Sequence, residues 1–434
     1  MNEEGHKGFE LRGWHVIVGL LAVLVVMFIL FRVFGRSSLE RKIAELRAKG
    51  YPTSLEELEK YNLLPEGVPN AADIYVKAFD AYRSPFEDEK NLLPYIGSVK
   101  PDDPITPETK AAMETFLSRN AKTLELLHQA GQVEQCRYQY PLIARQGFMY
   151  PYFAEVKNCA QLLNLFVLSQ VETGKGTEAF QGVIDNLRLG ESLRNEPMFI
   201  PFLIRIAIDG IAVGSVQGIL GRQMLSEQQM AELYAELLKI RQSLRMDQGL
   251  IGERCCLLDE SMMGQGLGFG TVPIRWVGFW DTNIVRSMEF IDQLEATTKL
   301  ESEKRWTEYQ RINNEVEHLS VLFYMTKVLL PSISRIGMLE LRSIAQVDCA
   351  RAALGVERFW LAEGRLPKSE ELAPKYLDTV LIDPFDGKPL RYKRFAKGYT
   401  IYSIGEDGED NGGIPKSKVQ KDEKFDLPFT VERE

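Results

Sequence analysis

The sequence predicts a mainly α-helical protein with an N-terminal transmembrane helix, a multi-helix domain and a small α+β C-terminal domain with a short antiparallel sheet. The first observation is an 18-residue apolar run near the N-terminus. The second is a series of helix-start signals followed by apolar residues at helical spacing. The third is strand-like alternation close to the C-terminus. These features divide the chain into a tail (1–13), an anchor (14–34), a helical domain (37–334) and an α+β domain (335–434).

Length and composition exclude several classes of protein. A chain of 434 residues predicts two or three domains. The 52 basic and 61 acidic residues give a net charge of −9, which argues against a nucleic-acid partner held by bulk positive charge. Five cysteines without a CxxC pair are too few for a disulfide framework and favour buried thiols.

The anchor is the strongest single signal. Residues Trp14 to Phe31 carry no Asp, Glu, Lys or Arg and, as a helix, would extend ~27 Å, close to the thickness of a bilayer core. A signal peptide has a shorter apolar core and a small-residue cleavage site, so we expect an uncleaved single-pass membrane protein. Basic residues on both sides leave its orientation open, although the positive-inside rule taken alone places the body in the cytoplasm.

Helices account for most of the region that follows. Capping signals at Ser37, Ser54, Thr106 and Ser226 predict helix starts. Residues 199–220 are strongly apolar but include Arg205 and Asp209, which favours a buried core helix over a second membrane span. Pro331 is expected to break the chain, and residues 336–363 to form one helix.

Strand signals appear after residue 384. Alternation near Leu390 and Tyr392, a turn, and the run 399–404 predict a hairpin, and 426–431 a final strand. An acidic, glycine-rich loop follows the hairpin. Its residues Asp407, Glu409, Asn411 and Gly412 match the opening of an EF-hand loop, but Lys418 stands where the bidentate Glu belongs. A solvated acidic turn and an ion-binding loop both remain open from these residues alone.

Two segments carry a family resemblance. The run DPFDGKPLRY at 383–392, followed by YTIYSIGEDG at 399–408, resembles the C-terminal domain of the major pseudopilin of type II secretion systems. That resemblance implies a calcium ion in the following loop, with Asp407 matching the Asp of the DG step, Asp410 and Asn411 within the loop, and Asp426 matching a later Asp of the final strand. It also implies that the bulk of the chain is extracytoplasmic, on the periplasmic side.

The resemblance is confined to roughly the last hundred residues. In pseudopilins the long helix continues from the membrane segment, whereas about 300 residues intervene here, and Gly13 stands where the cleavage pattern has Glu. We therefore expect neither processing nor filament assembly. The whole chain is similar in layout to uncharacterised membrane-anchored protein families of planctomycete-type bacteria, a similarity that implies no activity.

Two functions follow as expectations. The first is a non-catalytic envelope protein with a structural or protein-interaction role, related to type II secretion or pilus-like systems and stabilised by calcium. The alternative is an enzyme or small-ligand binder that uses the interior of the helical domain. Its metal candidates are two Glu-x-x-His pairs, Glu125/His128 and Glu315/His318, because residues at i and i+3 share one helix face. Lacking a strong catalytic motif, the sequence favours the first.

Overall fold

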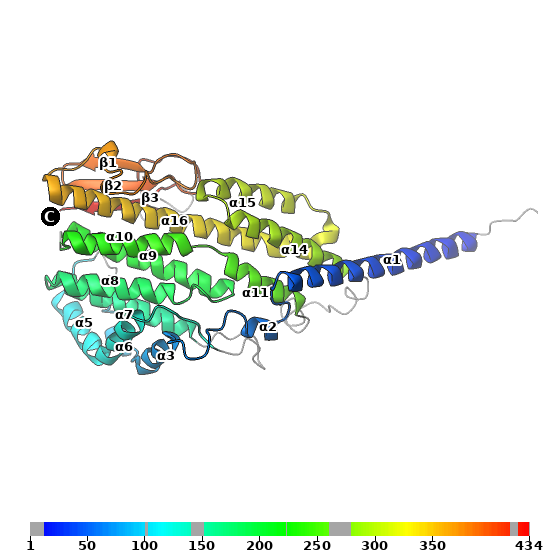
Figure 1. The fold of residues 1–434 in the computed structure, drawn as a ribbon, viewed down its shortest axis with the longest axis horizontal. Helices are drawn as coiled ribbons and strands as arrows, with labels where there is room; N and C mark the ends of the chain where they lie inside the picture. Colours follow the sequence, from blue (N-terminus) through cyan, green and yellow to red (C-terminus); the bar gives the residue numbers. More distant parts are fainter. Residues whose placement is uncertain are drawn as a thin grey trace, which may run out of the picture.

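The computed structural model describes residues 13–99, 103–139, 152–222, 224–259, 279–416 and 424–433. It is mainly helical, with one small antiparallel sheet near the C-terminus. The expected tail lies almost entirely outside the described residues. Figure 1 shows an elongated body, built of stacked helical layers with the sheet on one face, from which a single helix projects at one end.

The projecting helix is α1 (Gly13–Ala48), which runs for 36 residues without a break. The helix start expected at Ser37 is therefore wrong. Ser37 and Ser38 lie within the helix, where Arg41 donates to the Ser37 carbonyl and to the Ser38 hydroxyl. Strong helix formers follow the two serines, and Leu39 and Leu46 pack in one cluster with Trp280, so the helix continues. Gly50, at φ +79°, follows its end as a left-handed residue that glycine adopts at low cost.

The layer farthest from the sheet contains α3 (Ala72–Ala81), α5 (Pro107–Arg119) and α6 (Ala121–Gly131), which pack against the longer α7 (Phe153–Glu172). An ion pair between Glu89 and Arg119 joins α4 (Glu87–Lys90) to α5, and α2 (Leu55–Glu59) packs on residues 247–258. Thr106 and Ser54 cap α5 and α2 through their side-chain oxygens, which confirms two of the expected helix starts.

The central layers contain α8 (Gly176–Glu191), α9 (Phe199–Gly221), α10 (Glu227–Ser243) and α11 (Asp247–Leu258). Helices α8 and α11 pack on α9, and α10 packs on α8. The start of α10 is a complete capping box, because Ser226 and Gln229 exchange side-chain-to-backbone hydrogen bonds.

The long helix α16 connects both ends of the body. It follows α14 (Phe279–Thr298), α15 (Ser302–Glu317) and the 3-10 turn η1 (Val321–Phe323), and runs from Tyr324 to Glu363. Pro331 lies inside it, so the expected break there is wrong. A proline inside a helix costs ~3 kcal/mol. Leu330 and Ile333 are buried beside it, and packing of this kind can outweigh that cost. The boundary expected at residue 335 falls within this continuous helix.

The sheet has the order β1-β2-β3, with both pairs antiparallel. The strands are β1 (Arg391–Phe395), β2 (Gly398–Ser403) and β3 (Leu427–Glu432), and the expected hairpin and final strand are confirmed. A 3-10 turn, η2 (Ser369–Glu371), precedes the sheet. The buried face of the sheet packs on α16, and β3 also reaches α9.

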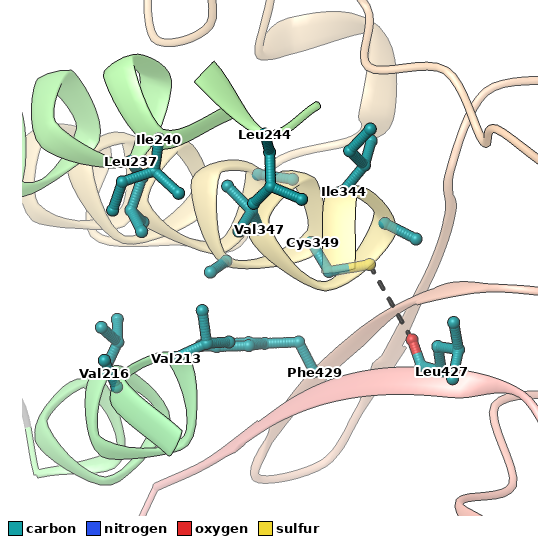
Figure 2. Close-up of a cluster of buried hydrophobic side chains, with 14 of the residues drawn as sticks. Val213, Val216, Leu237, Ile240, Leu244, Ile344, Val347, Cys349, Leu427 and Phe429 are labelled. Carbon is teal, nitrogen blue, oxygen red and sulfur yellow. Dashed lines mark hydrogen bonds between the residues drawn. The ribbon is translucent and has the colours of Figure 1, made fainter. Parts of the chain in front are cut away.

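Apolar side chains of α9, α10, α16 and the sheet form one continuous cluster (Figure 2). Val213, Ile240, Val347 and Phe429 come from four different elements and are all at most 6% exposed. The sheet and the central helices therefore share their core.

Two described helices are long and apolar enough to cross a membrane: residues 17–48 of α1, and α9. The bent pair of α15 and η1–α16, at 112°, satisfies the same criteria when joined. The apolar window of α1 is 0% buried, whereas 56% of the window in α9 is buried inside the body. Arg205 and Asp209 of α9 are also buried among helices, which fits the expected core helix.

Candidate functional site

The acidic loop leaves β2 at Gly405 and returns towards β3 through Asp426. Gly412 and Gly413 both have positive φ (+78° and +85°), which glycine alone adopts without strain. These two residues turn the backbone so that its amides face the carboxylate of Asp426. The fold thus places the four predicted ligands, Asp407, Asp410, Asn411 and Asp426, in one loop.

Asp426 organises this loop. Its side chain is 1% exposed and accepts hydrogen bonds from the amides of Asn411 at 3.2 Å and Gly413 at 2.5 Å. Burial raises the pKa of Asp426, and the negative charges of Asp410 and Asp407 raise it further, against the lowering by the two amides. The Asp426 carboxylate therefore holds the backbone of residues 411–413 in place, with other acidic side chains nearby.

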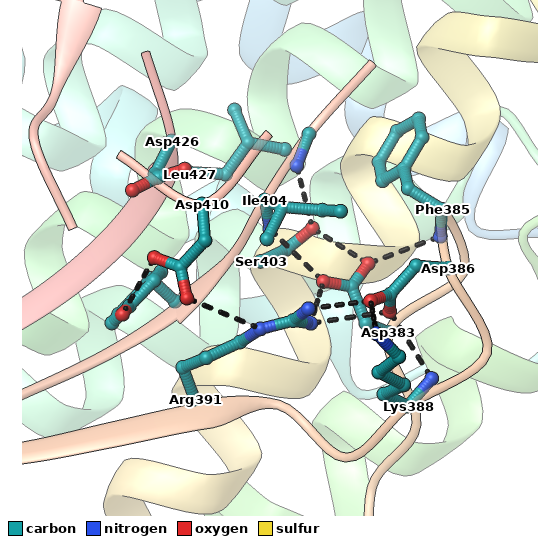
Figure 3. Close-up of polar contacts among 12 residues, drawn as sticks. Asp383, Phe385, Asp386, Lys388, Arg391, Ser403, Ile404, Asp410, Asp426 and Leu427 are labelled. Carbon is teal, nitrogen blue, oxygen red and sulfur yellow. Dashed lines mark hydrogen bonds and ion pairs between the residues drawn. The ribbon is translucent and has the colours of Figure 1, made fainter. Parts of the chain in front are cut away.

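Asp410 lies on the strand side of the loop (Figure 3). Its Oδ1 accepts hydrogen bonds from the Gly412 amide at 2.9 Å and the Tyr402 hydroxyl at 3.0 Å, and its Oδ2 is 4.0 Å from Arg391 Nε. The amide of Gly412 is the largest influence holding the pKa of Asp410 below its usual value. The ionised form of the Asp410 carboxylate is therefore favoured, and its Oδ1 already accepts two hydrogen bonds from the chain.

Asp407 and Asn411 close the outer part of the loop. Asp407 Oδ1 accepts the Glu409 amide at 3.0 Å, and Asn411 Nδ2 lies 3.5 Å from Asp407 Oδ2 and donates to the Glu409 carbonyl at 3.1 Å. Lys424 pairs with Glu409 across the loop. Hydrogen bonds and an ion pair within the chain therefore hold the loop in this shape.

These residues do not form a closed cation cage as they are arranged. Asp426 and Asp410 accept from donors of the chain, and within the described ranges no group of three or more His, Cys, Asp or Glu residues is placed to hold a metal ion. Each carboxylate oxygen retains lone-pair capacity beyond one amide. A cation would have to share these oxygens with the loop's own amides.

A second cluster, centred on Asp383, lies beside the loop (Figure 3). Asp383 is fully buried and accepts hydrogen bonds from the Phe385 and Ile404 amides at 3.0 and 2.9 Å and from the Ser403 hydroxyl at 2.8 Å. Arg391 Nη1 completes the set at 2.8 Å. Burial raises the pKa of Asp383, while these donors oppose the increase.

The sequence did not identify this cluster as a unit. The residues Asp383-Pro384 signal a local turn, and the Phe385 amide bond to Asp383 is that turn. The contacts with Ser403 and Ile404 cross about twenty residues, so local patterns carry no information about them. Through Asp383, hydrogen bonds connect the turn in segment 383–392 to the end of strand β2 in segment 399–408. The two segments that carry the family resemblance are therefore joined in the fold.

The Glu-x-x-His pairs lie on opposite sides of the body, on α6 and at the end of α15 (Figure 1). His128 Nδ1 is 3.2 Å from the carboxylate of Asp185, and Glu125 pairs with Lys122. His318 Nδ1 is 2.8 Å from the Asn314 carbonyl. The two pairs therefore do not converge on a shared dimetal centre.

Comparison of the chain with family models, with curated proteins and with solved structures yields no match.

Proposed function

We propose that the chain is a single-pass membrane protein with a non-catalytic structural or protein-interaction role, and that its body lies outside the cytoplasm. The pseudopilin-like signature relates this role to type II secretion or pilus-like systems. A protein partner is part of the proposal. Calcium at the acidic loop is a second, separable part.

Helix α1 is the observation that carries the proposal. Its apolar residues are exposed, with Leu20, Leu24 and Ile29 each about half accessible, whereas Leu39 and Leu46 further along the same helix are buried in the body. An exposed apolar helix of this length matches the thickness of a lipid core, and burial in one would stabilise it. Because the helix is continuous, the body is attached to the anchor without a flexible linker.

The buried charges support a structural role for the body. Arg137 pairs with Glu196 at 2.8 Å and Arg305 with Glu340 at 2.5 Å, and all four side chains are at most 8% exposed. The first pair joins the loops that follow α6 and α8, and the second joins α15 to α16. Glu196 also accepts the Tyr138 amide and Glu340 the Met246 amide, so both carboxylates are bound within the fold.

Calcium is proposed as a stabiliser of the loop. Asp407, Asp410 and Asp426 place three carboxylates in one loop, and their mutual repulsion contributes to the raised pKa of Asp426. A divalent cation would relieve that repulsion and would bind only the folded form. Calcium is more abundant outside the cytoplasm, so this part of the proposal agrees with the placement of the body.

The placement is tested with Leu361→Cys, an exposed site near the end of α16, in a Cys256→Ser background. The other four thiols of the chain are buried, so the added thiol is the reactive one. A membrane-impermeant maleimide applied to intact spheroplasts should label it. Labelling only after the membrane is opened would place the body in the cytoplasm and contradict this part of the proposal.

A second candidate function is binding of a small polar ligand. A cleft of about 600 Å³ lies between α6, α8 and α10, and Arg188, Glu191, Glu236 and Lys239 line it with both signs of charge. A zwitterionic ligand such as a free amino acid would match this lining. A ligand-dependent increase in melting temperature that Arg188→Ala removes would support it, and unchanged melting across amino acids would contradict it.

A further inference from the structure

The end of the body nearest α1 carries an exposed apolar turn. Val321, Leu322, Tyr324 and Val328, in η1 and the start of α16, are 81%, 51%, 68% and 45% exposed. We call these four residues the apolar turn. Single exposed apolar residues are ordinary on soluble proteins, but four within eight positions form a local patch.

The apolar turn is fixed to α14 by hydrogen bonds. Asn283 Nδ2 donates to the Leu322 carbonyl at 2.8 Å, and the Thr326 hydroxyl donates to the Asn283 carbonyl at 3.2 Å. Ser287 and Thr326 share a further buried hydrogen bond at 3.0 Å. These hydrogen bonds hold the apolar turn beside the first turns of α14.

The first turns of α14 lie beside the last turns of the proposed membrane segment of α1. A shallow apolar cleft of about 390 Å³ between α1 and α14 is lined by Met27, Leu30 and Phe34 on one side and Thr282 and Val285 on the other. Residues 27–34 are the last turns of the predicted anchor. Just beyond them, Leu39 packs in one cluster with Trp280 and Ile284.

These contacts place the apolar turn at the depth where α1 leaves the bilayer, and Figure 1 shows η1 at that end of the body. We propose that the apolar turn inserts into the bilayer interface and is a second membrane contact beside α1. The inference rests on the proposed anchoring. Tyr324 has the apolar ring and polar hydroxyl that suit an interfacial position, and Val321 and Leu322 suit the acyl-chain boundary.

The contact also gives the body a fixed orientation. A single helix permits tilting of whatever it carries, whereas a second contact restricts the tilt of a body joined to it rigidly. Continuity with α1 favours lipid as the occupant, because any protein docked on the apolar turn would itself have to sit at the membrane surface.

Fluorescent labels at two matched leucines test the proposal in the full chain reconstituted into phosphatidylcholine vesicles. Leu322→Cys and Leu361→Cys alter side chains that are both 51% exposed. Leu322 lies in η1 just before α16, and Leu361 lies near the C-terminal end of α16. The separation of Tyr324 from Leu361 is ~55 Å along this helix. A third label, at Leu24→Cys in α1, reports on the anchor itself. All three use the Cys256→Ser background and an environment-sensitive thiol-reactive dye.

Quenchers attached to lipid chains should reduce the fluorescence of the labels at 24 and 322 at least twofold more than that of the label at 361. Aqueous iodide should quench most strongly at 361. Quenching at 322 that equals quenching at 361 overturns the proposal while leaving the anchor intact. Protection from iodide at 322 without lipid quenching would indicate a protein partner or a second copy instead, which also overturns it. Loss of lipid quenching at 24 overturns both the anchor and the apolar turn.

Discussion

Arg391 and Asp383 form an ion pair that joins the start of strand β1 to a buried turn eight residues earlier. Arg391 Nη1 is 2.8 Å from Asp383 Oδ2, and Nη2 of the same guanidinium is 2.5 Å from Asp386 Oδ2. The same Asp383 carboxylate accepts the Ile404 amide just after strand β2. One carboxylate thus holds three segments of the C-terminal region together.

Replacing Asp383 with alanine should strongly destabilise the fold. The change leaves the Ser403 hydroxyl and the Phe385 and Ile404 amides without their acceptor. It also removes the buried partner of Arg391, which keeps its pair with Asp386. Loss of one partner of a buried pair costs about 3–5 kcal/mol. Urea unfolding of the full chain in detergent measures the effect. Asp386→Ala, which removes a partly exposed partner of the same arginine, should cost about 1 kcal/mol or less. Equal effects of the two substitutions would contradict the structural role of Asp383.

Glu295 should give the protein an acid-sensitive component of stability. Burial alone would raise the pKa of Glu295, but hydrogen bonds from Arg254, Lys299 and Tyr51 outweigh it and lower the pKa from 4.5 to about 2. Because the folded-state pKa is depressed, the stabilisation is complete above about pH 4.5 and is lost as the pH falls through about 2.

The corresponding substitution is Glu295→Gln. It should remove about 1–2 kcal/mol at neutral pH, a value reduced from full linkage because solvent screens part of the interaction. It should also flatten the decrease in melting temperature between pH 4.5 and 2. Glu289→Gln on the same helix is the control, because its side chain is about half exposed and pairs with Arg286 three residues away. A wild-type melting temperature that is constant over this range would refute the prediction.

Calcium should raise the melting temperature of the full chain, and a chelator should reverse the rise. Ligand at 100 times its dissociation constant stabilises a protein by about 2.7 kcal/mol. Asp407→Ala should abolish this calcium-linked increase, because it removes one of the three carboxylates proposed as calcium ligands.

Glu409→Gln is the control within the same loop, since the Glu409 side chain pairs with Lys424. It should retain the calcium response. A response that survives in Asp407→Ala would show that the loop assignment is wrong, and a wild-type protein indifferent to calcium would remove calcium from the account.

Gly252 should tolerate no side chain. A Cβ at this position of α11 would lie 2.0 Å from the Pro197 carbonyl oxygen, so the backbone must move. Overpacking of this kind costs about 1–3 kcal/mol. Gly218→Ala on α9 is the matched control, because nothing lies within 4 Å of its added Cβ and alanine favours helix by about 1 kcal/mol. Thermal melts should separate the two variants by several degrees, and equal melts would contradict the close packing of α11 on Pro197.

Local signals predicted much of the helical framework. The side chains of Ser54, Thr106 and Ser226 all cap helices, because capping is decided within four residues of the chain. The hairpin and the last strand were predictable for the same reason, since alternation and turn residues lie within a few positions of one another.

Features decided by distant residues were not predictable in this way. Pro331 and Ser37 were expected to interrupt helices, but packing and neighbouring helix formers keep α16 and α1 continuous. The sequence composition predicted an acidic loop. It did not predict that Asp426 accepts hydrogen bonds from the Asn411 and Gly413 amides, because those bonds depend on how β3 lies against the loop. The Arg305–Glu340 pair likewise joins residues 35 positions apart.

The most direct test of the central claim, that α1 anchors the body in a membrane, is alkaline carbonate extraction of membranes from cells that express the full chain. The wild-type chain should stay in the membrane pellet and be released only by detergent. The double substitution Leu21→Arg and Leu24→Arg adds about 2.5–3.5 kcal/mol per charge to insertion and should move the chain into the carbonate-soluble fraction. Release of the wild-type chain by carbonate would contradict the account.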